Sequence, residues 1–115
     1  FRAIRYSDVL LMAAEANNRK TSADDAKAQN YLNQVRARAF GNASQASTST
    51  GATLTQEIWD ERRLEFAMEG HRFFDLVRTG EAAAKISGFV SGKHEVFPIP
   101  QTEIDISGLT QNPGY

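Results

Sequence analysis

The sequence predicts a mainly α-helical fold, in which a pair of antiparallel helices precedes a helical corner and an irregular or short-strand C-terminal tail. Apolar residues recur at helical spacing through residues 5–39, which indicates two amphipathic helices. Charged and aromatic residues crowd residues 59–78 around Gly70, which indicates two shorter helices meeting at a corner. Prolines at positions 98 and 100 allow an extended edge there but exclude a central strand.

The composition argues against several classes of protein. The 13 Lys and Arg residues against 14 Asp and Glu residues give a net charge of -1, which lacks the positive charge of a nucleic-acid binder. The absence of cysteine excludes disulfides and thiolate nucleophiles. The longest apolar stretch, residues 9–14, is far shorter than the roughly 20 residues that span a bilayer. Because the chain of 115 residues starts at Phe1 without a targeting signal, we expect a processed chain or a piece of a longer protein.

The first predicted helix covers residues 5–17. Tyr6, Leu10 and Ala13 fall on one line at helical spacing, and the small side chains of Ala13, Ala14 and Ala16 allow a second helix to approach closely. We expect the two asparagines at positions 17 and 18 to end this helix.

The second predicted helix follows a short turn and completes the hairpin. A hydroxyl at Thr21 or Ser22 is expected to cap its beginning, and Gly41 is placed to end it in the left-handed conformation. Its apolar line consists of Ala28, Leu32, Val35 and Ala39.

The chain beyond the hairpin is predicted to contain a loop and two further helices. Residues 42–53 are small and polar, and they are expected to form a flexible loop. Thr55 is expected to cap a third helix that runs to about Gly70, and residues 71–78 form a fourth. We expect residues 1–115 to form one region.

Three carboxylates, Glu61, Glu65 and Glu69, repeat every fourth residue and therefore lie along one stripe of the third helix. They could act as metal or acid/base ligands, but Glu65 and His71 are six residues apart, unlike the Glu-x-x-His spacing of helical carboxylate sites. We therefore predict no metal site, and instead a structural lattice of ion pairs that fixes how two helices meet. Its predicted members are Glu61, Arg62, Arg63, Glu65, Glu69, Arg72, Asp75 and Arg78.

No pattern of a catalytic centre is present. The His94-Glu95 pair lacks the second histidine of a zinc protease, because Pro98 stands four residues after His94. Acids repeated on one helix face do not flank a glycosidic bond from two sides. We predict no catalytic residues, no cofactor and no enzyme activity.

The large aromatic side chains are predicted to belong to the core. Trp59 and Tyr6 could stack on a sugar or a base, but both lie at core spacing on their helices. The phenylalanines expected in the core are Phe66, Phe73, Phe74 and Phe97.

Five sequence blocks, taken in order, carry a resemblance to a known family. They are RYSDVLLMAAEA at 5–16, LNQVRARA at 32–39, the run from Glu61 to Arg78, PIPQTEI at 98–104 and QNPGY at 111–115. Together they resemble the C-terminal region of the SusD/RagB family. Only residues 42–53 lack a counterpart, so the resemblance covers nearly the whole chain.

The resemblance implies both a scaffold and a function. SusD/RagB members are nutrient-binding outer-membrane lipoproteins of Bacteroidetes, built on a tetratricopeptide-like α–α superhelix. It implies non-catalytic binding of an oligosaccharide or polysaccharide at the extracellular face, and delivery to a SusC-like TonB-dependent transporter. It also implies that this chain is a C-terminal fragment whose lipid anchor lies upstream.

Two points stay open at this stage. Sugar-contacting residues vary within the family, so no glycan-binding position is carried over. The alternative function is a stand-alone tetratricopeptide-type adaptor that binds a protein segment in its groove.

Overall fold

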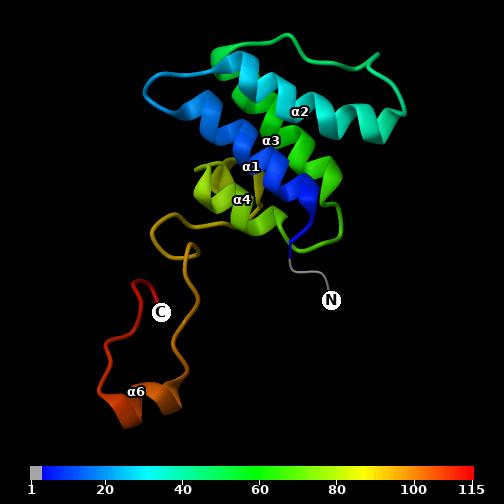
Figure 1. The fold of residues 1–115 in the computed structure, drawn as a ribbon. Coiled ribbons are helices and arrows are strands. Elements are labelled where there is room, and N and C mark those ends of the chain that lie inside the picture. Colours follow the sequence, from blue (N-terminus) through cyan, green and yellow to red (C-terminus); the bar gives the residue numbers. More distant parts are fainter. Residues whose placement is uncertain (1–3) are drawn as a thin grey trace. The chain divides into compact units, whose positions relative to one another are not determined.

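The computed structural model describes residues 4–115, which divide into two compact units after His71. The first unit holds α1 (Tyr6–Arg19), α2 (Asp25–Phe40) and α3 (Gly51–Glu65) (Figure 1). The second holds α4 (Arg72–Arg78), α5 (Ala82–Lys85) and α6 (Gln101–Ser107). Residues 4–115 contain no strand, so the mainly helical class is confirmed. The tail, predicted to be irregular or short-strand, is irregular apart from α6.

Helices α1 and α2 form the predicted hairpin, although two of its ends differ from expectation. Helix α1 continues through both asparagines, because Asn18 is buried and donates hydrogen bonds to Asp25 Oδ1 (2.8 Å) and to the Gly51 carbonyl (3.1 Å). Asp24 caps α2 by accepting from the Lys27 amide at 3.0 Å. Gly41 ends α2 with φ +71°, as predicted.

Helix α3 begins at Gly51, four residues before the predicted cap. Thr55 lies inside the first turns, where its hydroxyl donates to the Gly51 carbonyl at 3.2 Å and also contacts Asn18. The last three residues of the predicted loop, 51–53, are therefore helical. The flexibility of the segment stays a prediction.

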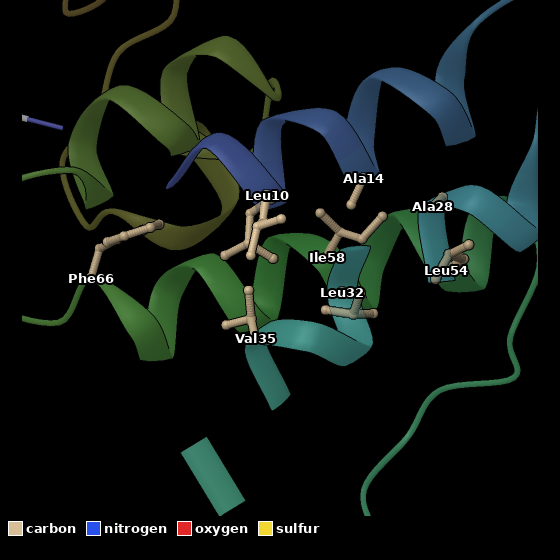
Figure 2. Close-up of a cluster of buried hydrophobic side chains, with 9 residues drawn as sticks. Leu10, Ala14, Ala28, Leu32, Val35, Leu54, Ile58 and Phe66 are labelled. Carbon is tan, nitrogen blue, oxygen red and sulfur yellow. The ribbon is translucent and has the colours of Figure 1, made fainter. Parts of the chain in front are cut away.

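The core of the first unit lies among these three helices (Figure 2). Leu11, Leu32, Leu54 and Ile58 are fully buried, and each contributes roughly 1.5–3 kcal/mol by leaving water. The remaining buried members of the cluster are Leu10, Ala14, Ala28, Val35 and Phe66.

Three aromatic residues predicted to be core are exposed. Tyr6 is 73% exposed because it occupies the first turn of α1, beyond the packed part of the helix. Phe74 is 64% exposed because neighbouring residues of a helix point about 100° apart, and it is Phe73 that is half-buried. Phe97, 70% exposed, lies in an irregular segment, whereas Phe66 is buried as predicted.

In the second unit, the C-terminal tail is tied to the proline-containing segment by side chains. The side-chain oxygen Oε1 of Gln111 accepts a hydrogen bond from the main-chain amide of Ile99 at 2.8 Å. The side-chain nitrogen Nε2 of Gln111 donates to the main-chain carbonyl of Ile99 at 2.9 Å. Asn112 donates to the Phe97 carbonyl at 2.6 Å, and the Tyr115 hydroxyl to the Val96 carbonyl at 3.0 Å. We call residues 96–99 and 111–115 the tail clasp.

Candidate functional site

A groove of about 740 Å³ opens where α1 begins and α2 ends. Its apolar lining comes from both helices, and Tyr6, Ser7, Gln34 and Arg38 also line it. An aromatic ring flanked by a few polar side chains is typical of sites for small ligands. The other residues of the lining are Ile4, Arg5, Leu10, Val35 and Ala37.

Glu65, the last residue of α3, holds two arginines that line this groove. Arg5 Nη1 lies 2.7 Å from Glu65 Oε1, Arg5 Nη2 donates to the Glu65 carbonyl at 2.7 Å, and Arg38 pairs with the same carboxylate. Burial alone would raise the pKa of Glu65, but the hydrogen bonds from Arg5, Ser7 and Arg38 outweigh it and lower the pKa. Glu65 thereby joins the ends of all three helices.

Glu69 follows α3 and strengthens the hold on Arg5. Its carboxylate lies 2.8 Å from Arg5 Nη2, so the guanidinium bridges two acids. Hydrogen bonds from Arg5 to Glu69 and then Glu65 raise the pKa of Arg5. The guanidinium is therefore charged at any physiological pH.

A second ion-pair centre lies between α2 and α3. Arg36 contacts Glu57 at 3.0 Å and Glu61 at 2.9 Å. Burial opposes ionisation of Glu57, but the bonds from Ser49 and Ser47 and the charge of Arg36 together lower its pKa. Arg36 therefore holds α2 to two successive turns of α3.

The remaining predicted lattice residues fall in three places. Arg62 is buried and pairs with Asp8 of α1 at 2.7 Å, whereas Arg63 is exposed on the same helix. Asp75 and Arg78 pair within α4 at 2.8 Å, and Arg72 is the half-buried first residue of that helix. Six of the eight predicted residues, all but Arg63 and Arg72, thus belong to described ion pairs, and these pairs form separate centres in the two units.

The arginines that hold Glu61, Glu65 and Glu69 were missed at the sequence level. They are Arg5, just before α1, and Arg36 and Arg38 of α2, all far away in the sequence. The partners expected were the arginines at positions 62, 63, 72 and 78. The signal available was the i,i+2 pair Arg36 and Arg38 near the end of α2, which together contact three acids of α3.

The second unit contains a smaller hollow of about 290 Å³. Phe73 lies 6.5 Å from Phe89 and 6.1 Å from Phe97 between ring centroids, and Tyr115 completes the lining. His94 accepts from the Val90 amide through Nδ1 at 2.9 Å. Four aromatic residues of this unit, Phe73, Phe89, Phe97 and Tyr115, therefore line one hollow.

No group of three or more His, Cys, Asp or Glu residues within residues 4–115 is arranged to hold a metal ion. Trp59 is half-buried beneath the Arg19 guanidinium, 5.6 Å from the ring centroid, and its indole nitrogen is buried. Within the same residues, no helix combines the length and apolar character needed to cross a bilayer.

Comparison with known proteins identifies the family. A model of the SusD family matches residues 1–96. The chain belongs to the SusD family. The resemblance seen in the sequence blocks is therefore confirmed.

Relatives in Formosa agariphila agree with this membership. SusD-like protein P2 is 33% identical to this chain over 97% of the chain and 25% of P2. SusD-like protein P25 is 40% identical over 66% of the chain and 14% of P25, and P38 is 33% identical over 76% and 18%. The chain thus spans a quarter or less of these curated relatives.

Proposed function

We propose that this chain is a scaffold region of a SusD-like protein that binds a nutrient glycan without cleaving it. The match of the SusD family model to residues 1–96 carries this proposal. The helical hairpin packed on α3 supports it, because such a unit offers a rigid frame for a binding surface. In this proposal the whole protein is a lipoprotein on the extracellular face of the outer membrane and delivers an oligosaccharide to a SusC-like TonB-dependent transporter.

The ion pairs have a structural role in this proposal. The centres around Glu65, Arg36 and Arg62 join α3 to α1, to α2 or to Arg5 just before α1, and their acids already hold arginines. Carboxylates engaged in this way are poor candidates for an acid/base pair, because a general acid needs a raised pKa and that of Glu65 is lowered.

Within this chain, the groove beside Tyr6 is the region where we propose sugar contact. The ring of Tyr6 is 73% exposed, and the polar groups of Gln34 and Ser7 lie along the same lining. An exposed aromatic face with neighbouring hydrogen-bonding groups suits an uncharged sugar ring.

The experiment is a glycan array with the full-length protein, followed by calorimetric titration of each glycan bound. We expect binding with the glycan recovered intact, and at least a tenfold loss of affinity for Tyr6→Ala but not for Tyr31→Ala. Absence of glycan binding by the full-length protein would overturn the proposed function. Cleavage that survives repurification and disappears in Glu65→Gln would replace it with an enzyme.

A further inference from the structure

The segment that connects α2 to α3 returns along α2, as the green trace above that helix shows (Figure 1). It carries no large apolar side chain that could anchor it to the core. Ser47 is nevertheless 6% exposed. Something other than apolar contact therefore holds this segment.

Polar side chains of α2 supply the contacts, and they meet the main chain of the segment in order. Asn33 donates to the Ser47 carbonyl at 3.0 Å and accepts from the Ser47 amide at 2.7 Å. Gln29 donates to the Ser49 carbonyl at 2.8 Å. One further contact of the same kind lies on each side of these two along α2.

At one end, Arg36 donates to the Gln45 carbonyl at 3.3 Å. At the other, Asp25 accepts from the Gly51 amide at 2.8 Å. Hydrogen bonds from Asn18 and then Gly51 lower the pKa of Asp25, so this acceptor is ionised at neutral pH. All five contacts reach main-chain atoms.

The spacing of these α2 side chains matches the spacing of the main-chain groups that they contact. Asp25, Gln29, Asn33 and Arg36 lie three or four residues apart, which places them on one face of α2 at steps of roughly 4.5–6 Å. Their partners are spaced by two residues, from Gln45 in a turn to Gly51 at the start of α3. Residues 46–50 between them lie outside helices and turns, and two residues of extended chain cover about 6.6 Å. The small difference between the two step lengths is compensated by the different lengths of the four side chains.

We propose that this face of α2 is a binding site for extended polypeptide main chain, and that residues 45–51 of the same chain occupy it. We call these four side chains the α2 row. Because the row contacts amides and carbonyls, it is indifferent to exposed side chains of its ligand. It is sensitive to register, since one extra residue turns the bonding edge of an extended chain away.

Amide hydrogen exchange in the whole chain tests the proposal, with the Ile58 amide reporting on the core. We expect the Ser47 amide to exchange at least tenfold more slowly than in an unstructured peptide. Asn33→Leu should raise the Ser47 rate at least tenfold, whereas Asn30→Leu, an exposed position on the same helix, should not. Asn33→Asp retains the acceptor and should keep Ser47 protected.

Two variants of the bound segment separate main-chain binding from anchoring by the exposed side chains of Gln45 and Thr48, and both leave the Ser49 hydroxyl, which donates to Glu57, unchanged. Gln45→Ala combined with Thr48→Ala should leave the Ser47 and Gly51 rates within about twofold, because both side chains are exposed. Insertion of one glycine between Thr48 and Ser49 should raise at least one of those rates tenfold. An unprotected Ser47 in the unaltered chain, or loss of protection in the double alanine variant, would overturn the proposal.

Discussion

Arg62 of α3 and Asp8 of α1 form the most enclosed ion pair described in residues 4–115, with 2.7 Å between Nη1 and Oδ1. Their side chains are only 7% and 10% exposed. The Arg62 guanidinium also lies 5.1 Å from the centroid of the Phe66 ring. A charge held in such a place depends strongly on its partner.

Asp8→Asn is therefore expected to destabilise the protein by about 3–5 kcal/mol, since it removes the negative charge opposite the buried Arg62 guanidinium and leaves the side-chain volume unchanged. Urea unfolding followed by circular dichroism measures the change. Asp60→Asn, at an exposed position on α3, serves as the control and should cost less than about 1 kcal/mol. Equal losses in the two variants would show that the buried pair has no special role.

Glu65→Gln should destabilise the first unit more than Glu69→Gln. The Glu65 side chain is 7% exposed and serves two arginines, whereas that of Glu69 is 38% exposed. We expect losses of about 2–4 kcal/mol and less than about 1 kcal/mol, respectively, because exposed pairs contribute little. Urea unfolding measures both losses of stability. A larger loss for Glu69→Gln than for Glu65→Gln would contradict the prediction that Glu65 contributes more.

Stability is expected to decline in acid. The folded-state pKa values of Glu57 and Glu65 are lowered, so their contributions are complete above the unfolded value, near 4.5, and are lost as pH falls through the folded values. Urea midpoints at pH 7, 5, 4 and 3 should be level at first and then fall. The fall should be smaller in Glu65→Gln, and an unchanged slope would argue against a role for Glu65.

Two positions in α4 test the assignment of the core in the second unit. Leu76 is 3% exposed, and Leu76→Ala should cost about 2–5 kcal/mol through lost burial and a cavity. Phe74 is 64% exposed, so Phe74→Ala should cost less than about 1 kcal/mol. Thermal unfolding of both variants provides the comparison, and a larger loss for Phe74 would mean that its ring is covered in solution.

The tail clasp depends on an amide that both donates and accepts. Gln111→Glu retains an acceptor for the Ile99 amide but removes the donor to the Ile99 carbonyl, whereas Gln111→Leu removes both. Exchange of the Ile99 amide should rise at least tenfold in the leucine variant and less in the glutamate variant. Thr110→Ala is the control, and rapid Ile99 exchange in the unaltered protein would contradict the clasp.

Local patterns predicted much of the first unit. Helical spacing located Leu32 and Val35 in the core, and Gly41 ended α2 as its conformational freedom suggests. The beginning of α3 was not predictable in this way. Threonine is a residue type that often caps helices, but Thr55 lies within α3, where its hydroxyl contacts Asn18 of α1.

The sequence blocks were sufficient to assign the SusD family, because five ordered motifs are far more specific than any single one. The acid stripe Glu61, Glu65 and Glu69 was also evident, since it follows from helix periodicity alone. The sequence did not show which arginines bind this stripe, because Arg5 and Arg36 approach the acids only after the three helices have packed.

By itself the sequence determined the helical class, the hairpin and the family, all of which depend on short-range periodicity or on ordered motifs. Only the tertiary structure decided which side chains meet. The exposure of Tyr6 depends on where α1 leaves its neighbours, and the placement of residues 45–51 depends on the polar face of α2. Contacts between residues far apart in sequence carry no local signature, because they form only when packing brings the elements together.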